Sequence, residues 1–148
     1  MVRAVRGIEE TRFSAYAVGT VYALTDTSAL LNFGTTDPSV TITKPGTYLI
    51  FARCRLDFNG ATFAANRLAT IKLRRTNNTA ADLTNASAGL PTGIITTLTG
   101  PLGNIVMPPV IYTTANSDDV IQMFGSVSVA PSAGSVDAAE AEIVVIPL

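Results

Sequence analysis

The chain contains no histidine and no tryptophan, and Cys54 is its only cysteine. The lack of imidazole excludes every histidine-based catalytic triad and every histidine metal site, and a single thiol excludes a disulfide within the chain. Cys54 takes an inward position in an alternating apolar segment, which favours a small core side chain over a nucleophile. We therefore expect a protein that is not an enzyme and has no cofactor.

Charge is scarce as well. Charged residues make up 14% of the 148 residues, about half the usual share, whereas 47% are hydrophobic. This balance suits a subunit that hides part of its surface in an assembly. The net charge of −1 gives no electrostatic basis for binding nucleic acid or an anionic membrane, so neither is expected as a partner.

Long apolar runs are also missing. No stretch of about 18 apolar residues exists to span a membrane, and no apolar run follows the opening MVRAVRG as it would in a signal peptide. We expect synthesis in the cytoplasm.

Alternation typical of β-strands is what the sequence does contain. In residues 41–58, TITKPGTYLIFARCRLDF, the turn dipeptide Pro45-Gly46 precedes the longest strand. Its inward positions are apolar throughout, and Asn59-Gly60 is expected to end it. Its outward positions are apolar first and charged later: Leu49, Phe51, Arg53, Arg55 and Asp57. An outer face that begins apolar needs a cover, and we expect a second copy of the chain to provide it.

Short strands recur along the rest of the chain, and no segment of ten or more residues has a helical period with caps. Residues 13–24 predict a strand pair or one strand bent at Gly19, whereas 76–91 predicts a loop with at most one short strand. The run from Ile143 is continuously apolar, which predicts a last strand buried on both faces in the middle of a sheet. The whole predicts an all-β, antiparallel sandwich or barrel over residues 13–148, preceded by an arm over 1–12.

The order of motifs resembles the jelly roll of the tumour necrosis factor (TNF) and complement globular-head superfamily, a fold also found in phage decoration, head-fibre and receptor-binding proteins. Residues 42–50, ITKPGTYLI, fit its apolar-x-x-Pro-Gly-x-Tyr-x-apolar pattern for an inner strand. Ser117-Asp118-Asp119-Val120 fits a later turn into a strand, and 141–148 resembles the last strand, which runs down a trimer axis. The likeness covers most of residues 13–148, although the chain lacks the tryptophan and most of the aromatic positions of the complement-type members.

The resemblance implies a homotrimer. It places six residues near the threefold axis: Tyr48, Leu49, Phe51, Val144, Ile146 and Leu148. The residues themselves point the same way, because the outer face at Leu49 and Phe51 and the apolar last strand both need covering. A monomer whose own loops cover these positions is the alternative.

Several acidic residues invite a chemical interpretation. Asp118 and Asp119, with Asp137 or Asp26, carry oxygen ligands suited to Ca²⁺, but no loop has the D-x-D-x-D-G spacing of a dedicated site, so turn-forming aspartates are preferred and no metal is expected.

Charges on the strands allow two further interpretations. Glu140 and Glu142 share a face of the last strand, and we expect them to pair with Arg53 or Arg55 and not to act as an acid–base pair. If their two strands share a sheet, five residues would form a basic patch that could contact an acidic partner: Arg53, Arg55, Lys72, Arg74 and Arg75. The balance of 10 basic against 11 acidic residues favours the alternative, in which they oppose acidic residues of the chain.

These observations favour a non-enzymatic virion protein, a trimeric capsid decoration or head-fibre protein of a bacteriophage that binds the major capsid protein or another virion protein. Arg3 and Arg6 in the arm are candidates for gripping the partner, with a solvated tail as the alternative. A receptor- or carbohydrate-binding tip is the second hypothesis, with a host-surface glycan held by loops around 77–91 and 100–109.

Overall fold

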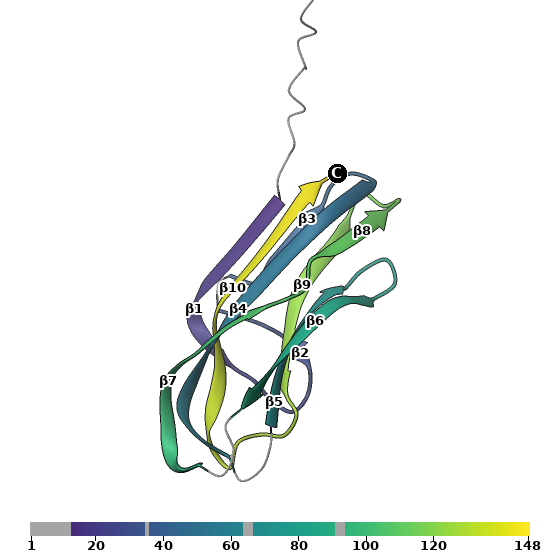
Figure 1. Ribbon diagram of the computed structural model, residues 1–148. Coiled ribbons are helices and arrows are strands. Elements are labelled where there is room, and N and C mark those ends of the chain that lie inside the picture. The colour runs from purple at the N-terminus through teal and green to yellow at the C-terminus, as the bar shows by residue number, and fades with distance from the viewer. Residues whose placement is uncertain (1–12, 35, 64–66, 91–93) are drawn as a thin grey trace, which may run out of the picture.

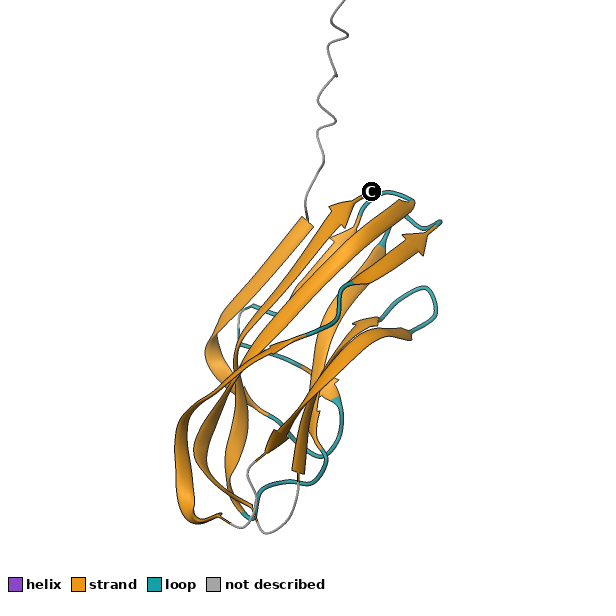
Figure 2. Cartoon of the chain, viewed as in Figure 1, coloured by secondary structure: helices purple, strands orange, loops and turns teal. Residues whose placement is uncertain are grey.

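The computed structural model describes residues 13–34, 36–63, 67–90 and 94–148, and it folds them into ten β-strands arranged as two packed sheets (Figures 1 and 2). No helix long and apolar enough to cross a membrane occurs in these described ranges. The predicted all-β, antiparallel sandwich is confirmed.

Each sheet has five strands, all paired antiparallel. The first, which we call the β4 sheet, runs in the order β1 (Phe13–Ala23), β10 (Ala133–Pro147) and β4 (Gly46–Phe63). The other edge of β4 pairs with β8 (Val110–Thr114) along its first part and with β7 (Ile94–Val106) along the rest. The second, the β9 sheet, contains β2 (Ala29–Leu30) and β3 (Ser39–Ile42) on one side of β9 (Asp119–Val127), and β5 (Arg67–Arg75) and β6 (Ala81–Leu90) on the other.

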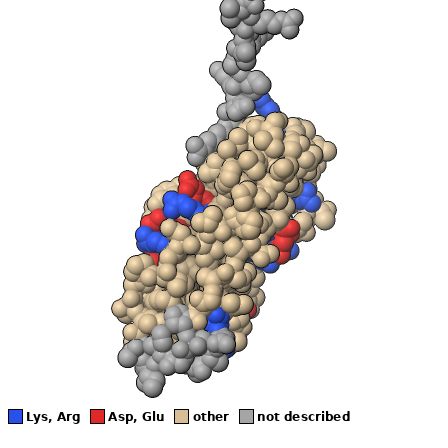
Figure 3. Space-filling view, in the orientation of Figure 1, with Lys and Arg blue, Asp and Glu red and all other residues tan. Residues whose placement is uncertain are grey.

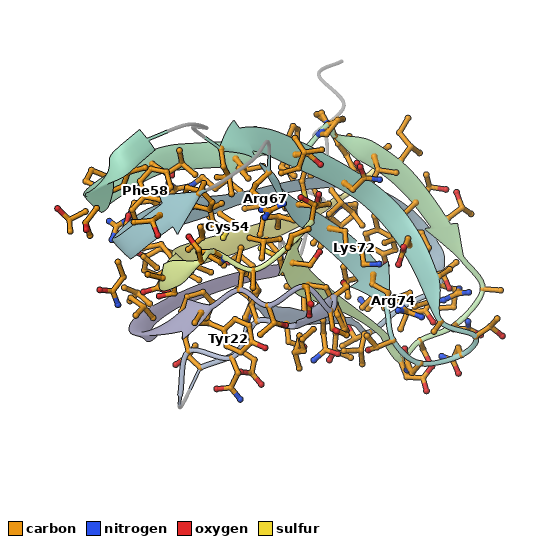
Figure 4. All side chains as sticks on the ribbon, turned by 90° about the horizontal axis from the view of Figure 1, so that it is seen from below. Tyr22, Cys54, Phe58, Arg67, Lys72 and Arg74 are labelled. Atoms are coloured by element: carbon orange, nitrogen blue, oxygen red, sulfur yellow. The ribbon has the colours of Figure 1, made fainter. Side chains whose placement is uncertain are left out.

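The core lies between the sheets and follows from the period of two in the sequence. Alternate residues of β4, β5, β9 and β10 are fully buried, among them Ile50, Leu56, Ile71 and Ile143. Cys54 also lies in this layer (Figure 4). The turn at Pro45-Gly46 carries the chain from β3 in one sheet to β4 in the other, and the hydroxyl of Tyr48 donates to the carbonyl of Lys44 at 2.6 Å across it.

Two details of the predicted strands are confirmed. The last strand, β10, does lie inside a sheet, between β1 and β4 (Figure 1). The segment around Gly19 is one bent strand, since the β1–β10 register shifts between Val18 and Tyr22 and Gly19 has a φ of 153°.

Three boundaries were wrong. β4 continues through Asn59-Gly60 to Phe63, because Gly60 takes a φ of 65° inside a bulge and does not end the strand. Most of the predicted loop 76–91 is the ten-residue strand β6. β7 runs for 13 residues despite Pro101, because it lies at the sheet edge beside β4, where a proline need not donate.

The bulge at the beginning of β10, between Ala133 and Ser135, leads to a prediction about stability. Gly134 has a φ of 66°, and a Cβ added there would lie 2.2 Å from the backbone of Gly60. Gly134→Ala should therefore destabilise the fold by about 2 kcal/mol or more, since backbone on both sides must move. The control is Gly89→Ala in β6, where a Cβ meets nothing within 4 Å. Urea unfolding checks both, and equal midpoints for the two variants would contradict the close approach of the two glycines.

Candidate interaction face

The outer face of the β4 sheet carries the largest group of exposed apolar side chains among the described residues. Register places them together: Val144 lies opposite Phe51, Ile146 opposite Leu49, and Leu49 opposite Ile111. Val106 lies one row further along, opposite Arg53. We call the set Leu49, Phe51, Val106, Ile111, Val144 and Ile146 the apolar patch.

Three members of the apolar patch are exposed, and Leu49, Val144 and Ile146 are half-buried. Val106 and Ile111 are 68% and 67% exposed, and Phe51 is 40% exposed. A hollow of about 120 Å³ opens in the face, lined by Phe51, Ala52, Arg53, Val106, Glu142 and Val144. A continuous apolar surface of this kind marks a contact site more often than a solvated face.

Four of the six residues predicted at a trimer contact lie on this side of the sheet, and a fifth lies just beyond the end of β10. Leu49, Phe51, Val144 and Ile146 are in the apolar patch, and Leu148 is 70% exposed beyond the end of β10. Tyr48 is a correction: it is 3% exposed and faces the core, because neighbours along a strand point to opposite faces. Arg3 and Arg6, predicted to grip a partner, lie outside the described residues.

A row of ion pairs borders the apolar patch. Arg53 Nε donates to Glu142 Oε2 at 2.8 Å, and Arg55 Nη1 donates to Glu140 Oε1. Both pairs join β4 to β10, as predicted from the sequence. We call these two pairs the charged ladder. Figure 3 shows acidic and basic side chains grouped in small clusters on a largely neutral surface.

The predicted basic patch does not form. Arg53 and Arg55 lie on β4, whereas Lys72 and Arg74 lie on β5 in the other sheet, where they face Asp82 at 3.0 and 3.7 Å (Figure 4). Arg75 instead donates to the hydroxyl of Tyr112 at 3.0 Å. The condition for the patch, one sheet for both strands, is therefore not met, and the other four residues each pair with an acidic side chain, in line with the favoured alternative.

Sequence reasoning missed several residues of the face. Ile111 follows the alternation of β8, so its outward position was readable once that strand was paired with β4. Tyr16 and Val18 are each 51% exposed on β1 beside the charged ladder. The outward position of Val106 was not predictable, because the prolines on both sides of it argue against a long strand there.

Asp119, weighed as a calcium ligand, is instead the centre of a buried hydrogen-bond network. Its Oδ2 accepts from the hydroxyls of Tyr112 and Thr114. Its Oδ1 accepts from the side-chain amides of Asn78 at 3.0 Å and Asn116 at 3.1 Å. This network ties the β8–β9 connection to the β5–β6 turn, where Asn78 has a φ of 49°. The carboxylate is structural.

The described residues give little support for a metal site, a reactive thiol or glycan-binding loops. No group of three or more His, Cys, Asp or Glu residues in those ranges is arranged to hold a metal ion. Burial raises the pKa of the Cys54 thiol to about 12, which keeps it protonated and unreactive at neutral pH. The loops proposed for glycan binding have become strands β6 and β7 over most of their length.

The Asp119 network predicts acid sensitivity. Burial alone would raise the pKa of Asp119, but the hydrogen bonds from Thr114, Tyr112, Asn78 and Asn116 outweigh it and lower the pKa to about 2 from 3.8. A depressed folded-state pKa gives stability that is fully present above pH 4 and is lost as the pH falls through 2. Protonation should therefore cost about 2 kcal/mol across that window.

Unfolding in urea at pH 7, 4, 3 and 2 measures this loss. Asp119→Asn should be less stable than the unmodified chain at pH 7 and should show a flatter decline toward pH 2. The exposed Asp26→Asn serves as the matched control and should follow the unmodified profile. Parallel declines in all three proteins would show that another group is responsible.

Comparison with known proteins supports the fold. No protein-family model matches the sequence, and no curated protein sequence is significantly similar to it. Among solved structures, the globular domain of zebrafish complement 1qA is 14% identical with a TM-score of 0.53, covering 95% of this chain and 98% of that domain. The Eiger TNF of S. frugiperda is 12% identical with a TM-score of 0.56, covering 92% of each chain. The chain therefore adopts the jelly-roll sandwich of the TNF and complement globular-head structures.

Proposed function

We propose that the chain is a non-enzymatic building block that assembles as a homotrimer through the outer face of the β4 sheet. The observation that carries this proposal is the apolar patch, which sits beside a charged ladder whose members already neutralise each other. A stable threefold contact buries over about 2,000 Å² with an apolar centre, and such a face supplies that centre. The threefold arrangement itself comes from the resemblance stated from the sequence.

At a finer level, the proposed trimer is a surface component of a bacteriophage particle, made in the host cytoplasm and incorporated into the virion. Its partner is then the major capsid protein or another virion protein, in the manner of a capsid decoration or head-fibre protein. The composition supports this, since a chain with 14% charged residues, no histidine and one buried thiol offers packing surfaces and few reactive groups.

Assembly is tested by light scattering at micromolar concentration. The unmodified chain should have a mass of about 46 kDa, which is three times 15.4 kDa. Ile111→Asp and Ile146→Asp should each give a folded monomer, because a carboxylate would be placed in a water-excluded contact. The matched control is Leu68→Asp, since Leu68 is 49% exposed on β5 in the other sheet. The proposed trimer contact would be contradicted if the unmodified chain is a monomer, or if both substituted chains still form trimers.

Particle binding is tested separately. The trimer should co-sediment with capsids of its own virus prepared without it, and it should show no binding on an array of host-surface glycans. Ile111→Asp should lose capsid binding together with trimer formation if the trimer is the binding unit. Binding to a glycan without binding to capsids would replace this proposal with the receptor-binding tip.

A further inference from the structure

Two carboxylates on the outer face of the β4 sheet stand directly opposite each other. Asp57 of β4 and Asp137 of β10 are register partners, so their side chains share a face and their Cβ atoms lie about 4.5–5.5 Å apart by sheet geometry. Asp137 is only 3% exposed. The Oδ1 atom of each residue is buried and accepts no hydrogen bond. Like charges placed opposite each other in this way destabilise a sheet.

The neighbouring residues compensate these charges only in part. Across the sheet, Asp137 is flanked by Ala23 on β1 and Asp57 by Pro101 on β7, and neither side chain can donate a hydrogen bond. Arg55 Nη2 lies 3.3 Å from Oδ2 of Asp57, so this ion pair leaves the buried Oδ1 of Asp57 without a partner. The same arginine also pairs with Glu140.

The charged residues at this place do not neutralise one another and leave two negative charges. Arg55 contributes one positive charge, and Asp57, Asp137 and Glu140 contribute three negative ones, so the net charge is −2. The Nε of Arg55 is also buried without a partner, so three of the five such side-chain atoms in the described part of the chain belong to this group of residues. Buried polar atoms without partners in a native fold call for a bound water or ion, and water leaves the charge in place.

We propose that Asp57 and Asp137 bind a calcium ion. A monatomic cation fits because both Oδ1 atoms are buried, out of reach of a lysine or arginine from another protein, and a double charge offsets the net −2. Calcium accepts carboxylate oxygens in irregular geometry, whereas magnesium retains its waters and needs more room. Entry is from the Asp57 side, whose side chain is 28% exposed.

The site is weak by composition. Two carboxylates supply at most four of the six to eight oxygens that calcium takes, so water and backbone carbonyls complete the shell. The dissociation constant should therefore fall on the order of 1 mM, as in extracellular calcium modules. The site lies within one chain and does not depend on the proposed trimer.

The test is thermal unfolding of EDTA-treated protein with CaCl₂ added to about 10 mM, beside MgCl₂ and NaCl at matched ionic strength. Calcium should raise the melting temperature by about 3 °C in a saturable manner, magnesium by less and sodium not at all. Equilibrium dialysis against radioactive calcium should give one ion per chain, whether the chain is a monomer or a trimer.

Variants then locate the ion. Asp57→Asn and Asp137→Asn should each raise the melting temperature in EDTA, because the repulsion is removed, and each should lose the calcium response. Asp26→Asn, on an exposed turn, should respond as the unmodified chain does. The proposal is overturned if calcium acts no differently from sodium on the unmodified chain, or if both variants keep the full response.

Discussion

The antiparallel pairing of β4 with β10 is the constraint on which the rest of the molecule depends. It extends over nearly the whole of both strands, from the Tyr48–Pro147 pair to the Thr62–Ala133 pair, and it is the most extensive contact between any two described elements. Because facing residues in a sheet share a side, this one register decides what the outer face displays. It brings apolar side chains together first, then two arginine–glutamate pairs, and then two aspartates. A slip by one residue would send the core residues of β10 outward.

The period of two made much of this readable from the sequence. Alternation predicted which residues of β4 point inward. Together with the correct prediction that β4 and β10 are neighbours, it also gave the central place of β10 and the pairing of Arg53 and Arg55 with Glu140 and Glu142. The same alternation could have excluded Tyr48 from the contact face, since Leu49 and Phe51 were already assigned to the opposite side. That error came from the resemblance and not from the residues.

Other features depend on information that lies outside any single segment. Whether β4 and β5 share a sheet is decided by where the chain crosses over, so the sequence could state the basic patch only as a condition. β6 contains three alanines and one each of aspartate, asparagine and glycine, all residue types that are depleted in strands, so its own preferences favour a loop. It forms a strand because β5 offers a full edge to pair with. The Asp119 network joins residues some forty positions apart, and only the packed turns bring Asn78 to it.

The distribution of charge on the outer face is consistent with a surface that is covered in the assembled protein. A buried charge is costly mainly when its partner is missing, and both arginines of the charged ladder bring their partners from the same chain. Covering that region therefore removes water from pairs that stay intact, and it leaves no isolated ion for the neighbour to satisfy. The apolar patch adds favourable burial beside it. The Asp57–Asp137 pair departs from this arrangement, and the calcium ion proposed there would neutralise that part of the face before a neighbour covers it.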